Sequence, residues 1–399
     1  DGQLLLWVVY MTWEQVQTAR GYEGISSISP SYNFGVAGVL DQHHNRLASS
    51  QEETASERVG RRGKDAVAAQ YSTQSAAPTE LVSLSQPSGD PDITLFNNYV
   101  SDARQGNNTF IYHIEHGVDF LGLSQVPHLP TYLSNLTSLK PGIDYTTPTF
   151  HSTLPPYHGT CTASKALGRT LGVAKSATLI SDIMASFAGE EMASAFAEVA
   201  LDLLRRPERR GRSVVSLSLG ADGREWFGGV FDGVGEGDLV KGLMAEVMAM
   251  DVPVVVAAGN HGAEARRGEV DMVPAVWAGD DEGFPLIAAG SCDGSGERSV
   301  FSQGGGKVTV HAVGEDVTCY TGEGLQVEGK RRGTSYAAPI VAGQIAVWLS
   351  SENVPVDTTR GRLVGSMRNY LKSSPAAAWA RVGNTRVIWN GVTEANNPR

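Results

Sequence analysis

A serine near the C-terminal end of the chain has the setting of a nucleophile. Ser335 follows Gly333 and precedes an apolar run over residues 340–348, which places it at or just before a helix N-terminus. Free backbone N–H groups and the helix dipole stabilise developing negative charge there. Pro339 is compatible with this helix only in its first turn, because deeper in a helix it would break the hydrogen-bond ladder. Taken alone, Ser335 is better explained as an N-cap serine, so the nucleophile hypothesis depends on its partners.

Three upstream segments carry the residue types that such a serine needs. They are residues 115–119, 157–160 and 257–260, and the first and third directly follow apolar strands. A serine needs a base such as His158 to take its proton, and the base needs a third group that holds its tautomer. An amide such as that of Asn260 can donate to an oxyanion, and losing one such donor costs about 2.7–4 kcal/mol of barrier.

The elements that must position these residues alternate along the chain. Apolar strands are predicted over 109–114, 171–180, 213–219, 252–258, 286–289 and 308–313, and helices over 159–167, 190–206 and 238–250. This order predicts an α/β fold with a mostly parallel sheet covered by helices on both faces. Sites in such folds lie at the C-terminal ends of the strands, where the polar segments occur.

The N-terminal part of the chain differs from the rest. Residues 1–30 form a strand–helix–strand pattern too small to bury a core, and residues 31–80 are poor in large apolar side chains. The second stretch is predicted to be a flexible linker. Its basic cluster Arg61-Arg62-Gly63-Lys64 fits either a processing site or a solvated charge run. Residues 81–373 are predicted to form the main domain, and 374–399 a last strand or docking tail.

Composition excludes several functions. The 399 residues carry a net charge of −11, which argues against a nucleic-acid interface or an anionic-membrane surface. The apolar run over residues 4–9 is too short to span a bilayer. An esterase of the α/β-hydrolase type is disfavoured, because no G-x-S-x-G elbow occurs. Since the chain starts at Asp1 without a leader pattern, we expect the natural chain to begin further upstream.

Three cysteines do not suffice for a disulfide framework. Cys292 and Cys319 could pair, although free buried thiols explain them equally well. Cys161, which follows the histidine segment, is interpreted as a packed thiol rather than a nucleophile. Sequons at Asn107 and Asn135 permit glycosylation if the chain is secreted.

The chemistry-bearing segments together resemble the motifs of one enzyme family. His158-Gly159-Thr160, Ala258-Gly259-Asn260 and residues 333–343 resemble the histidine, oxyanion and serine motifs of the subtilisin-like serine peptidases, the subtilases. The resemblance covers residues 81–370. It implies a three-layer fold and a serine endopeptidase that acts through an acyl-enzyme. Ser335 would be the nucleophile, His158 the base and Asn260 the oxyanion donor.

Further residues gain roles from the same resemblance. Ser218, Leu219 and Gly220 resemble the segment that lines the specificity pocket and pairs with substrate as an added strand, and Ala258 and Gly259 are included in the substrate site. Val273-Pro274-Ala275 falls where the family has a Pro-Ala turn. His261 is interpreted as a pocket-rim residue or a solvated side chain.

One position departs from the family pattern. The family's acidic motif is Asp, then Ser or Thr, then Gly, whereas this chain has Glu115-His116-Gly117. Glu115 is one methylene longer, so its carboxylate must retract or His158 must shift, and a misplacement of about 1 Å can cost about 100-fold in rate. His116 could compete for the carboxylate. Asp119 is the alternative candidate for orienting His158, but it lies past the position of the family's acidic residue, so Glu115 is preferred. The alternative hypothesis is therefore a catalytically impaired homologue that binds peptides or acts as a scaffold.

The resemblance also implies partners and location. Polypeptides are the expected substrates of a monomer, and residues 1–30 resemble the end of an inhibitory propeptide, as in a zymogen. No cofactor is required. Structural calcium occurs in the family, but no clear oxygen-rich loop supports it here. The expected location is secreted or vacuolar.

Overall fold

The computed structural model describes residues 35–36, 70–90, 92–118, 136–138, 157–184, 189–222, 236–279, 283–323 and 326–399. The N-terminal strand–helix–strand, the basic cluster at 61–64, Asp119 and Asn135 lie outside these residues.

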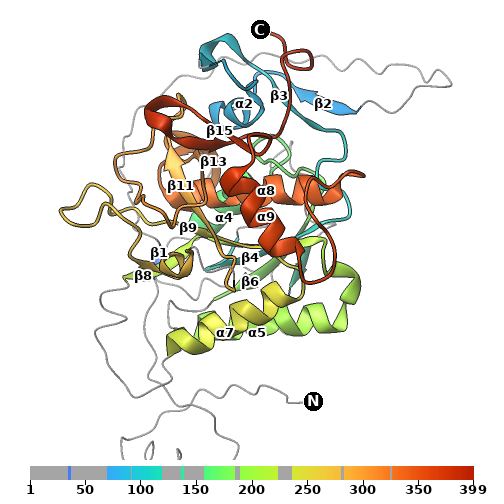
Figure 1. Ribbon diagram of the computed structural model, residues 1–399, viewed down its shortest axis with the longest axis vertical. Coiled ribbons are helices and arrows are strands. Elements are labelled where there is room, and N and C mark those ends of the chain that lie inside the picture. Colours follow the sequence, from blue (N-terminus) through green and yellow to red (C-terminus); the bar gives the residue numbers. More distant parts are fainter. Residues whose placement is uncertain are drawn as a thin grey trace, which may run out of the picture.

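A nine-stranded sheet forms the centre of the molecule (Figure 1). Its spatial order is β15 (Ala378–Ala380), β16 (Arg386–Ile388), β12 (Val310–Val313), β11 (Ile287–Cys292), β9 (Val254–Ala257), β7 (Ser213–Leu217), β4 (Phe110–Glu115), β6 (Thr178–Ile183) and β5 (Leu136–Ser138). Adjacent strands are parallel except for the antiparallel pair β15–β16. Strands β7 and β9 are buried along their whole length, as near-continuous apolar runs require.

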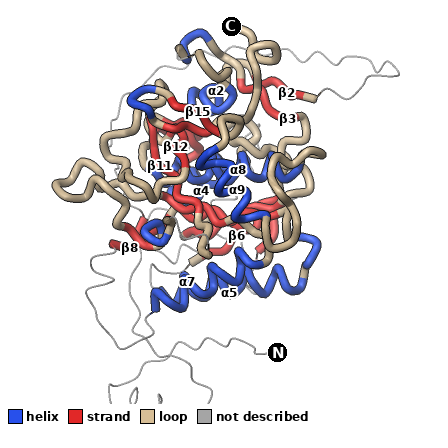
Figure 2. Tube along the Cα trace, in the orientation of Figure 1, coloured by secondary structure: helices blue, strands red, loops and turns tan. Residues whose placement is uncertain are grey.

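Helices cover both faces of this sheet, which confirms the predicted α/β three-layer fold. Helices α5 (Gly189–Arg205) and α7 (Glu236–Ala249) lie side by side below β4 and β6 in Figure 1. Helices α4 (Tyr157–Leu167) and α8 (Thr334–Ser350) lie on the other side, with α9 (Leu363–Ser373). Figure 2 shows the same arrangement as red strands between two groups of blue helices. The buried face of α5 carries Met192, Phe196, Val199 and Leu203.

Residues on both sides of the predicted main domain pair with it, and the last strand expected after residue 373 is present. Strand β2 (Tyr71–Gln74) pairs with β3 (Tyr99–Asp102), and α2 (Thr79–Ser85) follows it. Glu80 of α2 is buried and its Oε1 lies 2.5 Å from Nζ of Lys165 on α4. At the other end, β15 and β16 extend the central sheet. Residues 70–80 and 374–399 are therefore parts of the domain, because their side chains and backbone are paired with its core.

The strand predicted over 171–180 is shorter than expected. Only its last three residues, 178–180, are extended, in β6, whereas residues 171–177 form turns that return to the end of α4. Val173 N donates to the Lys165 carbonyl and Ala174 N to that of Ala166. The apolar residues of this stretch are thus buried against a helix end and not within the sheet.

Pro339 lies deeper in α8 than predicted. The helix begins at Thr334, so Pro339 is its sixth residue. A proline there cannot donate to the carbonyl four residues earlier, which is that of Ser335. Ser218 Oγ donates to this carbonyl instead, at 2.8 Å. The prediction that Pro339 must lie in the first turn of the helix was therefore wrong, because a side chain from another element replaces the missing donor.

The cysteine pairing also differs from the prediction. Cys161 of α4 forms a disulfide with Cys319 of β13 (Val317–Glu323), while Cys292 is a buried free thiol. The two Cα atoms lie 5.0 Å apart although the residues are 158 positions apart in sequence, which no spacing argument reveals. Strand β13 forms a hairpin with β14 (Gln326–Arg331), which leads into α8. A bridge of this kind stabilises a fold by about 2–5 kcal/mol and here links α4 to the hairpin before α8.

Short 3-10 helices complete the fold at Ile93–Leu95, Pro207–Arg209, Ala275–Trp277 and Val382–Asn384. Among the described residues, the structure has no helix with both the length and the apolarity needed to cross a membrane.

Candidate active site

Glu115 and His158 meet where the end of β4 approaches the start of α4. His158 Nδ1 lies 2.9 Å from Glu115 Oε1, and the two side chains are only 11% and 1% exposed. The approach depends on Gly159, because a Cβ there would lie 2.1 Å from the Gly117 carbonyl oxygen. The small residue after His158 therefore brings the histidine within hydrogen-bond distance of the strand end.

The longer glutamate side chain is accommodated by folding back on its own strand. Glu115 Oε2 accepts a hydrogen bond from the backbone N–H of His116 at 3.3 Å, while Oε1 faces His158. The His116 ring donates from Nδ1 to the Met184 carbonyl at 3.2 Å. This hydrogen bond holds the imidazole that was expected to compete with His158 for the Glu115 carboxylate. Burial raises the pKa of Glu115, but the facing His158, with His113 and His116, brings it below its ordinary value. The carboxylate is thus held in its charged form.

Ser335 is the second residue of α8, the helix whose third residue contacts His158. Its Oγ donates to the Ser218 carbonyl at 3.2 Å, and Ser218 Oγ donates back to the Ser335 carbonyl. The ring of the next residue, Tyr336, lies 5.6 Å from the His158 ring, centroid to centroid. His158 Nε2 makes no hydrogen bond with the residues that the structure describes. Hydrogen bonds between nucleophile and base often tighten only when substrate binds.

Asn260 is held by the residue that starts α8. Its Oδ1 accepts hydrogen bonds from Thr334 N at 2.8 Å and Thr334 Oγ1 at 3.0 Å. A Cβ on Gly333 would lie 3.2 Å from Asn260 Nδ2, so the amide nitrogen faces the turn before Ser335. The amide is therefore oriented with its donor end toward the helix N-terminus that carries the serine.

The segment predicted to bind substrate, residues 218–220, leads into a strand that already pairs with another segment of the chain. Strand β8 (Leu219–Asp222) pairs with β10 (Met272–Val273) on one side and with β1 (Gly35–Val36) on the other. The β1 pairing is antiparallel, with Gly35 opposite Gly220 and Val36 opposite Leu219. Ser218 precedes this strand, and Ala258 and Gly259 lead to Asn260. The structure thus brings every predicted site residue into one region.

Sequence reasoning treated His113 as structural and missed its link to His158. His113 lies two residues before Glu115 on β4, and its Nε2 is 2.8 Å from Thr162 Oγ1. Thr162 Oγ1 also lies 3.1 Å from the backbone carbonyls of His158 and Gly159. Carbonyls only accept, so the hydroxyl donates to them and accepts from a protonated Nε2 of His113. The two-residue strand period shared with Glu115 is the signal that could have revealed this.

This arrangement predicts a pH-dependent loss of stability. Burial lowers the pKa of His113 to about 4 from an ordinary 6.5, so the folded state resists a proton that the unfolded chain binds. Its contribution is complete above pH 6.5 and falls as the pH drops toward 4, by on the order of 2–3 kcal/mol. His113→Gln keeps an N–H donor for Thr162 and should flatten this decline. Urea unfolding at pH 7, 5.5 and 4.5 measures it, and parallel curves for the two proteins would contradict the assignment.

His261 is a partly exposed side chain that is paired with a neighbouring carboxylate. Its Nδ1 lies 2.6 Å from Glu264 Oε1, and its side chain is 24% exposed. The residue belongs to a polar network described below.

Comparisons with known proteins agree with this geometry. The model of the Subtilase family matches residues 114–380. Subtilisin-like serine protease Pen ch 13 of Penicillium rubens is 27% identical over 299 residues, covering 74% of this chain and 64% of that protein. Subtilisin-like protease 2 of Trichophyton rubrum is 29% identical over 243 residues, covering 59% and 50%. The chain spans less than two thirds of the length of these relatives.

A solved structure shows the same fold. The crystal structure of a cold adapted subtilisin-like serine proteinase superposes with a TM-score of 0.57 at 22% identity, covering 79% of this chain and 98% of that one. The family model covers well over half of the chain, from β4 to the end of β15. The motifs around His158, Asn260 and Ser335 therefore identify their family correctly, and the chain belongs to the subtilases.

Proposed function

We propose that this chain is a serine endopeptidase that hydrolyses peptide bonds through an acyl-enzyme. The observation that carries the proposal is the contact of 2.9 Å between buried Glu115 and His158, beside a serine at a helix N-terminus. Glu115 holds the proton on His158 Nδ1, which leaves Nε2 to take the proton of Ser335 Oγ. The hydroxyl oxygen then attacks the scissile carbonyl.

The remaining steps use groups already placed around Ser335. Asn260 and the backbone N–H of Ser335 donate to the oxyanion as the tetrahedral intermediate forms. The His158 imidazolium, stabilised by Glu115, gives its proton to the leaving amine. Water then enters and attacks the acyl carbon as His158 takes its proton. The bond from that carbon to Ser335 Oγ then breaks, and His158 returns the proton to this oxygen. No step requires a cofactor or a metal.

Polypeptides are the proposed substrates, bound as an added strand on β8. The pairing of Gly35–Val36 with Leu219 and Gly220 supports this, because it shows that the edge accepts backbone from another segment. It also supports the proposal that the N-terminal segment acts as an inhibitor of its own domain. While it is paired there, a substrate strand cannot use the same backbone groups of β8.

Removal of the N-terminal segment tests this inhibition. A chain that begins at residue 70 should cleave a fluorogenic peptide at least about 10-fold faster than the full chain, because no competing strand then occupies β8. If this shorter chain does not refold alone, it is refolded in the presence of the full chain, which is removed before the assay. Adding the separate fragment 1–69 should slow it again. Equal rates for both chains would rule out inhibition by this segment.

The second candidate function is that of an impaired homologue that binds peptides. Glutamate in place of the family's aspartate and the absence of a hydrogen bond from Ser335 to His158 favour it. Labelling with a fluorophosphonate, mapped by mass spectrometry, separates the two. If the chain is an endopeptidase, we expect label on Ser335 of the wild type and no label in Ser335→Ala. A folded wild type that takes no label would favour the binding role.

A secreted or vacuolar monomer is the proposed form of the protein. The Cys161–Cys319 disulfide supports a compartment where thiols oxidise.

A further inference from the structure

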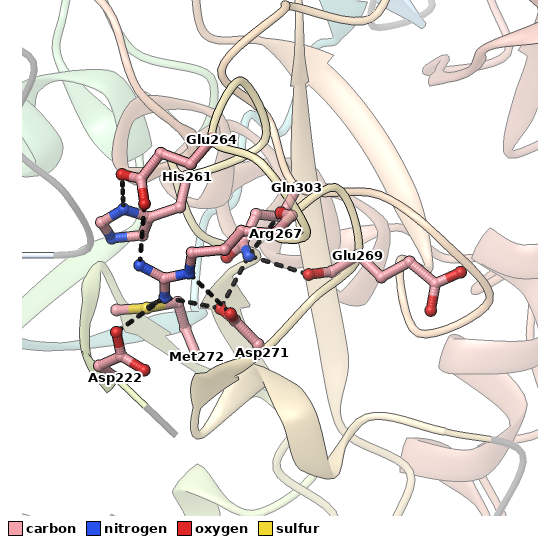
Figure 3. A network of polar contacts seen from close by, with 8 residues as sticks. All are labelled: Asp222, His261, Glu264, Arg267, Glu269, Asp271, Met272 and Gln303. Atoms are coloured by element: carbon pink, nitrogen blue, oxygen red, sulfur yellow. Dashed lines mark hydrogen bonds and ion pairs between the residues drawn. The ribbon is translucent and has the colours of Figure 1, made fainter. Parts of the chain in front are cut away.

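A buried arginine lies at the centre of a polar network next to the candidate site (Figure 3). The Arg267 side chain is 5% exposed and faces three carboxylates. Asp271 binds it through two oxygens, at 2.7 Å and 2.9 Å. Asp222 Oδ2 lies 3.0 Å from Nη2, and Glu264 Oε2 lies 3.4 Å from Nη1. Although burial raises the pKa of Asp271, hydrogen bonds from Arg267 and Gln303 lower it overall, which keeps this partner charged.

The network reaches the oxyanion segment through Gln303. The backbone N–H of Gln303 donates to the Gly259 carbonyl at 3.0 Å, and its side-chain Nε2 donates to the Arg267 carbonyl and to Asp271 Oδ1. Its Oε1 packs against Gly259, where a Cβ would lie only 2.0 Å away. Gly259 directly precedes Asn260, so the position of the amide donor depends on this contact.

The same guanidinium reaches the end of the substrate-pairing strand. Asp222 is the last residue of β8 and lies opposite Met272 of β10. Arg267 also contacts Met272, with Nη2 at 3.5 Å from Sδ. One side chain therefore touches both strands and the loop that follows Asn260.

We propose that Arg267 is a positioning residue that fixes the β8 edge relative to Asn260, with Asp222 as its contact on β8. This inference rests on the proposed peptidase function. A substrate that pairs with β8 must present its scissile carbonyl at the oxyanion donor, so edge and donor need a fixed separation. A short ester that does not reach β8 needs the donor alone.

Asp222→Asn is the sharpest variant, because it replaces the charged contact between Arg267 and β8 by a neutral one, while Asp271 still pairs with the buried guanidinium. Glu269→Gln is the matched control, since it makes the same charge change and its carboxylate points away from Arg267 in Figure 3. For the full chain we expect Asp222→Asn to lower kcat/KM about 10-fold, mostly through KM, on a peptide of six or more residues. On a single-residue ester the loss should stay below about twofold. Arg267→Lys keeps the charge but loses the planar pair of N–H donors, so its loss on the peptide should exceed its loss on the ester by the same ratio as in Asp222→Asn. In the double variant, Arg267→Lys should add little to the loss caused by Asp222→Asn.

Hydrogen–deuterium exchange in the Ser335→Ala full chain gives a readout without catalysis. Asp222→Asn should speed exchange of the amides in residues 218–222 about 10-fold, and Glu269→Gln should not. Equal losses on peptide and ester, or unchanged exchange in Asp222→Asn, would overturn the positioning role. A wild type inert on both substrates would refute the proposed function, and the exchange rates would then decide the positioning role by themselves.

Discussion

Ser335→Ala is expected to lower kcat on a peptide substrate by about 10,000-fold to a million-fold, the largest effect of any single substitution in this chain. Without the Ser335 hydroxyl the variant cannot form the covalent acyl-enzyme of the proposed mechanism, and the oxyanion donors alone cannot supply a nucleophile. The fold should persist, because only the hydrogen bond from Ser335 Oγ to the Ser218 carbonyl is lost. Steady-state hydrolysis of a quenched peptide and a thermal melt measure the two quantities.

Ser366→Ala in α9 is a matched control, since it removes the same hydroxyl from a helix that carries no proposed site residue. It should leave kcat within twofold of the wild type. Residual activity of Ser335→Ala above about one part in a thousand would show that another group supplies the nucleophile.

Glu115→Gln is expected to lower kcat by about 10,000-fold with little change in KM. The amide keeps the shape of the side chain but cannot stabilise the His158 imidazolium, and its N–H end favours the wrong histidine tautomer. The wild-type carboxylate is ionised across the neutral range, because His158 and its neighbours bring the pKa of Glu115 below its ordinary value despite burial. The loss should therefore already be present at neutral pH, where the wild-type carboxylate is charged, and kcat of the two proteins at pH 7 and 8 measures it.

Glu115→Gln in a folded protein with more than about one tenth of wild-type kcat would contradict the orienting role. A melt within a few degrees of the wild type is the necessary control, because the side chain is buried.

The sequence predicted the fold well because its signals are local. Continuous apolar strands such as 110–115 and 213–217 predict a buried parallel sheet, and the glycine after His158 is dictated by a close backbone approach. Four features escaped prediction because each joins residues far apart in the chain. These are the Cys161–Cys319 bridge, the Ser218 hydroxyl that compensates for Pro339, the Glu80–Lys165 pair and the Arg267–Asp222 contact.

The position of the Glu115 side chain also could not be predicted from the sequence. Residue type alone left two outcomes open, a retracted carboxylate or a displaced histidine. The structure shows the first, because the backbone N–H of His116 offers a hydrogen bond to the second carboxylate oxygen. That donor belongs to the turn after β4, whose geometry no motif specifies.

The most direct test of the central claim is casein hydrolysis by the wild type, Glu115→Asp and Ser335→Ala, compared at equal concentrations of folded protein. We predict that the wild type cleaves and that Ser335→Ala does not. Glu115→Asp should be slower than the wild type by about 10- to 100-fold, because the shorter side chain falls short of His158 Nδ1. Cleavage by Glu115→Asp alone would contradict the account and would identify the natural chain as a decayed peptidase with a role in binding.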